Sequence, residues 1–282
     1  MSPIKIDAHQ HFWRHDPAVH TWMNDQMTIL MQNHLPADLR PALDREGIVG
    51  CVAVQADSSI QENEFLLQLA DQNRWILGVV GWVDLQSPQL PQQLDRWCQH
   101  RRAVGVRHIV QDEPDDRFLD GETFRQGVRS LAQRGQTYDL LIYERQLPAA
   151  IEFVQAIPEV PMVLDHIAKP RIEAGVLEPW ASQIKELALA PNLMCKLSGM
   201  VTEASWKNWS PDDLRPYIET AIEAFGPDRL MFGSDWPVCR LAAEYPQVKN
   251  LVEPYLATLS DSERAAIEGG NASSFYRLEE RR

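Results

Sequence analysis

The order of the apolar segments constrains the fold of this chain more than any other feature. Eight short runs of apolar and β-branched residues recur, and most alternate with amphipathic stretches of helical periodicity. The expected strands are residues 5–9, 49–55, 76–83, 104–110, 138–143, 162–166, 193–197 and 230–233. Strands that alternate with helices pair in parallel, and eight such units are typical of a closed barrel. The sequence therefore predicts an α/β fold, a single (β/α)₈ TIM barrel.

The helical stretches between the strands support a single domain. Leu35, Leu39 and Leu43 share one face of a helix that Gly47 is placed to end, and residues 248–256 and 262–276 follow the last strand. No internal repeat, low-complexity tract or linker divides the chain. We expect one domain that spans residues 1–282.

An open, doubly wound parallel sheet is the competing architecture. Such a sheet would carry a glycine-rich turn directly after its first strand. The first run instead ends in the sequence His-Gln-His-Phe-Trp, at residues 9–13. This segment favours the closed barrel.

Composition and charge exclude several classes of partner. The 282 residues have a formal net charge of -13, which argues against nucleic acid because phosphate binding needs a concentrated cationic surface.

Four separated cysteines without a CxxC spacing indicate reduced thiols. No signal sequence and no apolar run of membrane-spanning length is visible. We expect a cytoplasmic protein with a small-molecule substrate. The nine tryptophans leave a homo-oligomer open.

Two histidines, His9 and His11, stand two residues apart at the end of the first run. Alternate side chains of a strand point to one face, so both imidazoles would aim at one point and form half of a first-row metal site. Asp7 is expected to share neither their side nor their role and to anchor neighbouring backbone. A chance His-x-His pair is the plain alternative, and the other strand ends argue against it.

Polar residues stand at the ends of the other expected strands as well. Catalytic residues of a barrel cluster at the C-terminal ends of its strands, and polar groups there are costly unless paired or in use. The candidates at these ends are Gln55, Trp82, Asp84, Arg107, His108, Tyr143, Asp165, His166, Lys196, Ser198, Asp235 and Trp236. So many polar groups at equivalent positions predict a site for metal or acid–base chemistry.

Each of these residues also has a structural interpretation. His166 would equally serve as a core histidine bonded to a carbonyl, and Asp235 as the cap of the turn that follows it. Lys196 would equally face solvent or pair with Asp165, and Arg107 would form a salt bridge at its strand end. The functional interpretation requires that these side chains meet in space.

The histidines and Asp235 together suit a divalent ion. Three imidazoles and a carboxylate fit Zn²⁺ or another borderline ion, so His9, His11, His166 and Asp235 are the expected metal ligands. Asp235 would be a weak ligand or a hydrogen-bond partner of the attacking water. In either case it is the natural general base.

These motifs together resemble the amidohydrolase superfamily. The similarity rests on residues 7–11 and 231–237, and the most specific further segments are 105–114, 164–170, 196–199, 201–204 and 206–207. The match narrows to the amidohydrolase-2 branch of sugar lactonases, of the L-fuconolactonase and L-rhamnonolactonase types, along nearly the whole chain.

The resemblance implies hydrolysis of a sugar lactone by activated water, with Asp235 and His166 as catalytic residues. It implies one divalent ion, Zn²⁺ first, because Tyr143 replaces the fifth-strand histidine of binuclear relatives and Arg107-His108 offers no bridging ligand. Some relatives in this branch look able to work without any metal, so the resemblance also allows a site that holds no ion. Arg107 is expected to anchor the substrate. The other expected pocket residues are Gln55, Trp82, His108, Tyr143, Lys196 and Trp236.

Other functions stay open at this point. The same barrel would support hydrolysis of a pyrone dicarboxylate or a muconolactone, or decarboxylation of an aromatic acid. A dicarboxylate would need a second cation, for which Lys196 or Lys169 is available. A barrel that binds a sugar acid without turnover is a remote alternative from another class.

Overall fold

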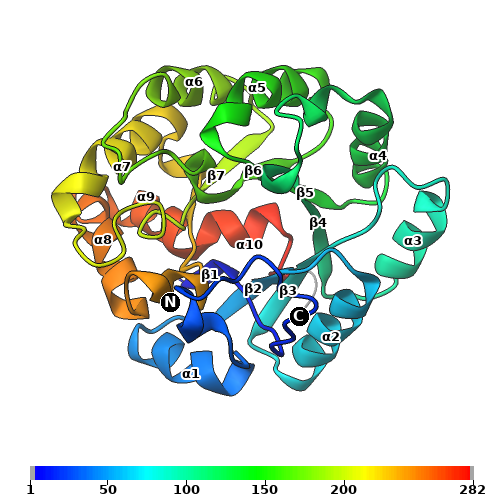
Figure 1. Ribbon diagram of the computed structural model, residues 1–282, viewed down its shortest axis with the longest axis horizontal. Coiled ribbons are helices and arrows are strands. Elements are labelled where there is room, and N and C mark those ends of the chain that lie inside the picture. The colour runs from blue at the N-terminus through cyan, green and yellow to red at the C-terminus, as the bar shows by residue number, and fades with distance from the viewer. Residues whose placement is uncertain (1–3, 280–282) are drawn as a thin grey trace.

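A computed structural model describes residues 4–279, and in that part of the chain eight parallel strands form one sheet in sequence order (Figure 1). The strands are β1 Ile6–Gln10, β2 Gly50–Val54, β3 Ile76–Gly81, β4 Ala103–Ile109, β5 Thr137–Leu141, β6 Met162–Leu164, β7 Leu193–Leu197 and β8 Leu230–Phe232. A parallel bridge between Gln10 and Trp236 joins the first strand to the segment after the last. The expected (β/α)₈ barrel is confirmed, and each expected strand has a counterpart.

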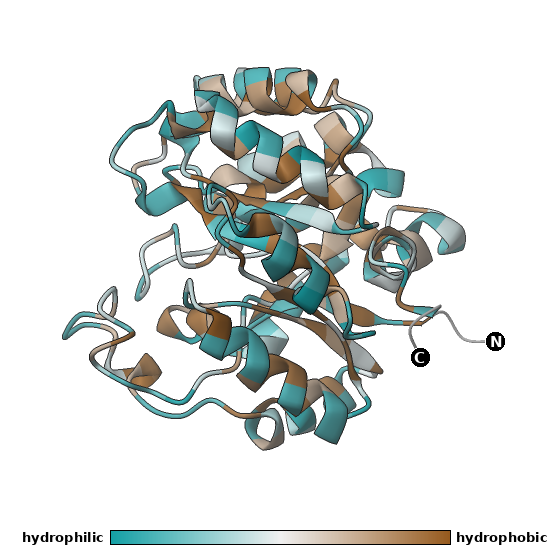
Figure 2. Cartoon of the chain, turned by 90° about the vertical axis from the view of Figure 1, so that its right-hand side faces the viewer, coloured by the Kyte–Doolittle hydropathy of each residue, from teal (hydrophilic) through white to brown (hydrophobic). Residues whose placement is uncertain are grey.

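Helices surround the sheet and turn their apolar faces toward it (Figure 2). The helices between and after the strands are α1 Pro36–Arg45, α2 Ile60–Gln72, α3 Leu90–Trp97, α4 Glu122–Ala132, α5 Leu147–Ala156, α6 Trp180–Leu187, α7 Pro211–Phe225 and α8 Tyr245–Leu256. Leu39 and Leu43 of α1 are fully buried, as their spacing predicts. Among the described residues, no helix is both long and apolar enough to cross a membrane.

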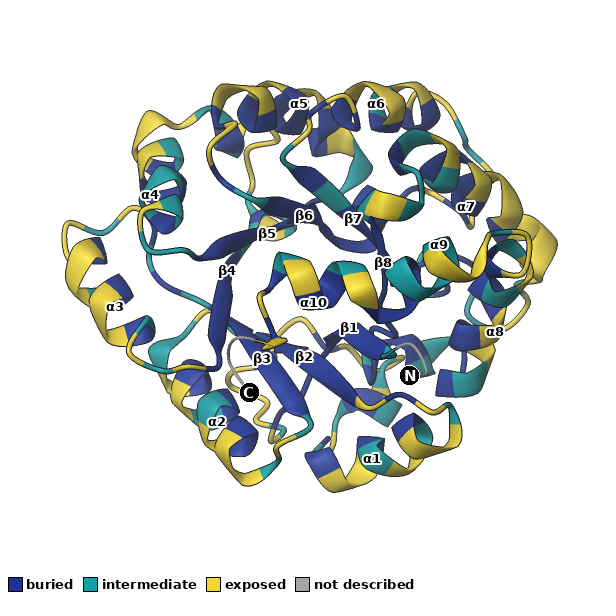
Figure 3. Cartoon of the chain, turned by 180° about the vertical axis from the view of Figure 1, so that it is seen from behind, coloured by how far each residue is buried: buried dark blue, intermediate teal, exposed yellow. Residues whose placement is uncertain are grey.

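The C-terminal segment differs from the single helix expected over residues 262–276. It contains α9 (Asp261–Ala265), a π-helical turn (Ala266–Gly270) and α10 (Asn271–Phe275). At Gly269 a side chain would approach the carbonyl oxygen of Ile4 to 2.2 Å, so only glycine lets the turn pack this closely on the start of β1. The interruption therefore follows from close contact with the barrel. Figure 3 shows α10 lying across the barrel.

The barrel has two hydrophobic layers. The interior layer includes Ile6, Ala8, Val52, Val54, Val104 and Met231, and Ala272, Tyr276 and Leu278 of the C-terminal segment pack into it. The outer layer lies between the sheet and the helices and is far larger. The C-terminal segment thus closes the end of the barrel at which the strands begin.

A register irregularity in β1 sets the direction of its side chains. The pairing of β1 with β2 shifts between Asp7 and Gln10. Ala8 packs inside the barrel, whereas Asp7 accepts hydrogen bonds from the backbone of His9 and from Ser234 and Tyr245, at 2.6–3.1 Å. Asp7 therefore anchors backbone, as expected. It also fastens the end of β8 to β1.

Candidate active site

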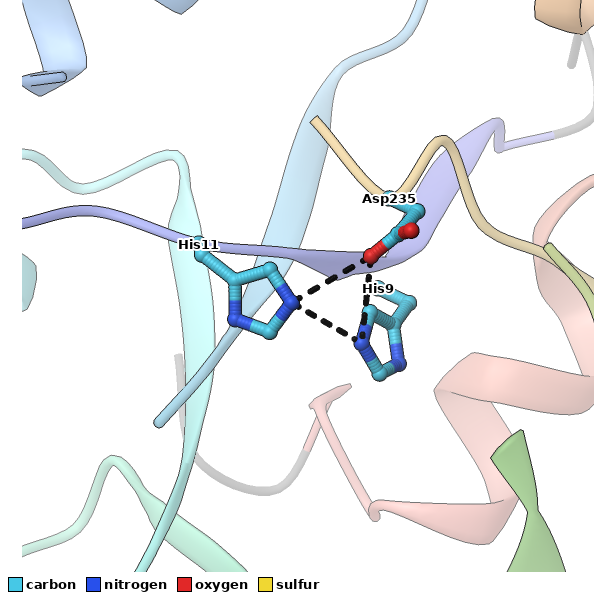
Figure 4. Close-up of side chains that lie close together, drawn as sticks. All are labelled: His9, His11 and Asp235. Carbon is cyan, nitrogen blue, oxygen red and sulfur yellow. Dashed lines mark hydrogen bonds and ion pairs between the residues drawn. The ribbon is translucent and has the colours of Figure 1, made fainter. Parts of the chain in front are cut away.

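The functional centre lies at the end of the barrel where the strands finish. His9 of β1, His11 directly after it and Asp235 from the segment after β8 point toward one another (Figure 4). The two Nε2 atoms lie 3.2 Å apart, and Asp235 Oδ1 is 3.3 Å from His11 Nε2 and 3.9 Å from His9 Nε2. His166 Nε2 is 3.8 Å from the same carboxylate oxygen. All four side chains are almost completely buried.

The hydrogen bonds of the histidines leave their inner nitrogens free to act as ligands. His11 Nδ1 donates to the carbonyl oxygen of Val54 at 2.8 Å, so a neutral His11 presents a bare Nε2. Asp165 Oδ1 lies 3.2 Å from His9 Nδ1, and its negative charge attracts a proton to that nitrogen. His166 Nδ1 lies 2.9 Å from Ser198 Oγ. Lone pairs and a carboxylate that face one another at these distances repel unless a cation or a shared proton lies between them.

The electrostatics of the site agree with this arrangement. Burial lowers the pKa of His9 and of His166 well below the ordinary imidazole value, so both rings are neutral near pH 7. Burial raises the pKa of Asp235, but the neighbouring His166 and His11 outweigh it and hold that pKa below its ordinary value. Neutral imidazoles and an ionised carboxylate are the forms that bind a divalent ion. The donor set therefore fits such an ion.

A left-handed turn places His166. Four consecutive residues without a glycine, from His166 to Lys169, have φ values between 46° and 62°. Each such residue costs roughly 1–2 kcal/mol relative to right-handed backbone. Ser198 and Gly199 lie beside the His166 ring, and a side chain at Gly199 would meet His166 Nδ1 at 2.4 Å. Asp235 is also left-handed, with φ 58°. This strain is concentrated where the ligands are positioned.

A second cluster of donors lies behind His9, and a lysine already occupies it. His9, Asp165 and His166 together could hold another ion. Lys196 Nζ, however, lies 3.0 Å from His9 Nδ1 and 2.9 Å from Asp165 Oδ1, and the lysine is fully buried. Its ammonium supplies the positive charge that a second ion would bring. This contact supports the expectation of one ion rather than two.

A cavity of about 310 Å³ opens onto the donor cluster, within the size range of small-molecule sites. Its apolar wall consists of Trp13, Trp22, Met27, Ala56, Val238 and Leu241. Its polar side consists of His11, Arg107, Gln111, Asp112, Tyr143, His166, Lys169, Thr202, Glu203 and Asp235. Trp206 completes the lining together with Ile109 and Leu141. One face for apolar contact and one rich in donors and acceptors suit a small polyhydroxylated ring.

The sequence-predicted pocket residues fall into three groups. Arg107 and Tyr143 line the cavity. Arg107 donates to the backbone and side-chain oxygens of Gln55 and, at 3.0 Å, to Asp165 Oδ2. Gln55 and Lys196 are fully buried beside these groups and are not part of the lining. Gln55 contacts the lining residue Arg107, and Lys196 contacts the candidate ligand His9.

Three more of the predicted residues form the third group, outside the cavity lining. His108 pairs with Glu113 at 2.6 Å and stacks on Phe118. The backbone of Trp82 is held by Asn63, and Trp236 packs between Phe12 and His34. None of these three side chains is among the described residues that line the cavity.

Sequence reasoning missed several residues of the site. Asp139 of β5 is fully buried and accepts from Lys196 Nζ at 2.5 Å, and its inward alternation with Leu141 was an available signal. The lining residues Trp13, Trp22 and Trp206 lie in loops, where no periodicity indicates that a side chain faces a cavity. In the sequence, Thr202, Glu203 and Trp206 stand out only as parts of two segments that carry the family resemblance, 201–204 and 206–207.

Comparison with known proteins gives consistent matches over the whole length. The model of the amidohydrolase family (Amidohydro_2) matches residues 6–278. An L-fucono-1,5-lactonase of Burkholderia multivorans is 42% identical, over 99% of this chain and 98% of that protein. One from Burkholderia ambifaria is 35% identical, over 98% and 96%. A crystal structure of a Burkholderia multivorans amidohydrolase with bound zinc superposes with a TM-score of 0.93 at 41% identity, covering 97% of this chain and 99% of that one.

Substitution Gly199→Ala tests the placement of His166. The new methyl group would collide with the imidazole, so we expect weaker Zn²⁺ binding, measured by competition with a chromogenic chelator, and a fall in turnover of at least tenfold.

Gly175→Ala is the matched control, because Gly175 has the same positive φ of 64° but no atom within 4 Å of the added carbon. Both variants carry the backbone cost, and only the first disturbs the site. Equal losses of Zn²⁺ affinity in the two variants would contradict this assignment.

Proposed function

Because the chain belongs to the amidohydrolase family, we propose a role for each residue around the cavity in the opening of a sugar lactone. The chain is a lactone-hydrolysing enzyme, as the curated lactonases across its full length support. We propose L-fucono-1,5-lactone as the preferred substrate, since both of those relatives bear that name. The observation that carries the mechanism is the convergence of three histidines and Asp235 on one point, which the cavity reaches through His11, His166 and Asp235.

Zn²⁺ is the ion that we propose for this site. His9, His11, His166 and Asp235 offer nitrogen and oxygen donors of the kind that zinc prefers, and the similar Burkholderia multivorans structure contains zinc. When bound, the ion supplies positive charge that polarises the lactone carbonyl. The Val54 carbonyl, Asp165 and Ser198 orient the three rings toward it.

Asp235 is the proposed general base. Its ionised carboxylate accepts a proton from water as the water oxygen bonds to the carbonyl carbon and the carbonyl oxygen takes up the electron pair. When the ring C–O bond breaks, Asp235 returns the proton to the departing ring oxygen. Arg107 faces the cavity from β4 and stabilises negative charge as it accumulates. Tyr143 and the tryptophans of the apolar wall hold the ring.

We propose that residues 1–282 form one domain that acts in the cytoplasm on a small lactone, with neither nucleic acid nor membrane as a partner. The net charge of -13 supports the exclusion of nucleic acid. The cavity fits a dicarboxylate substrate less well than a neutral lactone. Its second cation, Lys169, already lies 3.8 Å from the carboxylate of Glu203 and is not free to pair with a second substrate carboxylate.

A panel of lactones tests the substrate and the metal together. We expect proton release from L-fucono-1,5-lactone to be fastest, from other aldonolactones to be slower, and from 2-pyrone-4,6-dicarboxylate and muconolactone to be negligible. Removal of the metal with a chelator should lower the rate, and added Zn²⁺ should restore it.

Hydrolysis of the dicarboxylate without hydrolysis of any aldonolactone would assign the alternative function. Tight binding of the sugar acid with no turnover would support a binding protein instead. Full activity after complete metal removal would contradict the role given to Zn²⁺.

Asp235→Asn tests the general base. The amide keeps the size of the side chain but accepts no proton, so kcat should fall by about 10²–10⁴-fold while circular dichroism and Tm stay near those of the unaltered protein. Asp71→Asn, at an exposed aspartate that pairs with His100, is the control and should keep full activity. Retained lactonase activity in Asp235→Asn would contradict the assignment of Asp235 as the general base.

A further inference from the structure

Tyr276 connects the C-terminal segment to the charged interior of the barrel. It follows α10, is 1% exposed, and packs with Ala8, Val52 and Met231 inside the barrel. Its hydroxyl donates to Asp139 Oδ2 at 2.8 Å, and Lys196 Nζ lies 5.7 Å from the centre of its ring. A residue near the end of the chain thus reaches the polar groups behind the active site.

An unbroken set of contacts leads from this tyrosine to His9. Asp139 Oδ2 accepts from Tyr276 and from Lys196 Nζ, the latter at 2.5 Å. The same ammonium lies 2.9 Å from Asp165 Oδ1 and 3.0 Å from His9 Nδ1. Asp139, Asp165, Lys196 and His9 are all fully buried, so no solvent screens these contacts. The position of Lys196 therefore depends on how strongly each carboxylate attracts it.

We propose that Tyr276 is a positioning residue for the reaction, acting on His9 through Asp139 and Lys196. Its hydroxyl shares the charge of Asp139 with Lys196, which leaves the ammonium free to stay beside Asp165, the carboxylate that faces His9 Nδ1. Without the hydroxyl, Lys196 Nζ is the one remaining hydrogen-bond donor to Asp139 Oδ2 among the described residues, so Asp139 attracts the ammonium more strongly. The contact behind the His9 ring then weakens. This inference rests on the proposed function of His9.

A purely structural role would require the ring of Tyr276 rather than its oxygen. The aromatic ring fills the end of the barrel and is retained in Tyr276→Phe. The hydroxyl makes no other hydrogen bond within the described part of the chain. Loss of the oxygen alone therefore separates positioning from packing.

Tyr276→Phe should lower kcat for L-fucono-1,5-lactone about tenfold, in the range found for residues that orient metal-bound histidines. KM should stay within about twofold, because Tyr276 packs at the start of the strands and the cavity lies at their ends. Tyr217→Phe is the matched control. Tyr217 is a buried tyrosine that packs on Trp180 outside the barrel, and its variant should keep the activity of the unaltered protein.

A double-mutant cycle with Asp139→Asn tests the route of the effect. If Tyr276 acts through Asp139, then Tyr276→Phe causes no further loss of kcat once Asp139 is an amide. Independent, additive losses in the double variant would overturn the proposal, and so would an unchanged kcat in Tyr276→Phe.

Zn²⁺ affinity provides a readout that does not depend on turnover. Chelator competition should show weaker Zn²⁺ binding in Tyr276→Phe than in Tyr217→Phe. If the unaltered protein opens no lactone, the proposed function fails, yet this comparison still tests the positioning role. Equal affinity in the two variants would count against it.

Discussion

The structure depends on one electrostatic constraint, the approach of three imidazoles and one carboxylate inside a buried pocket. Their inner atoms lie 3.2–3.9 Å apart and present lone pairs to one another. Such a cluster is unfavourable by itself, because burial removes the water that would separate the groups. A divalent cation at the common point converts this repulsion into attraction, so the site and its ion stabilise each other.

Much of the surrounding barrel serves to hold that arrangement. Asp7 ties the end of β8 to β1, which brings Asp235 beside His9. The left-handed turn after β6 directs His166 inward at a cost in backbone energy, and Gly199 leaves room for its ring. Lys196, paired with Asp139 and Asp165, balances the buried charges behind the cluster. The backbone strain and the buried charges destabilise the fold. A purely structural barrel would not need them, whereas a catalytic site explains them.

The sequence predicted the strands because buried parallel strands are short apolar runs, and β7 has the expected bounds, Leu193–Leu197. It predicted that His9, His11, His166 and Asp235 would meet, because the barrel topology brings the strand ends together. It did not predict the left-handed turn, since residues 166–169 contain no glycine. The contacts of Asp139 with Tyr276 join distant segments without a local pattern. Trp82 and Trp236 follow the ends of their strands, so their directions depend on loop geometry, which periodicity does not determine. His108 follows Arg107 within β4, so the alternation of a strand turns it to the opposite face.

The most direct measurement is a crystal structure of the Zn²⁺-loaded protein with data collected on both sides of the zinc absorption edge. The account predicts one anomalous peak within bonding distance of His9 Nε2, His11 Nε2, His166 Nε2 and Asp235, with Lys196 still beside Asp165. A peak elsewhere in the protein, or two peaks that displace Lys196, would contradict it.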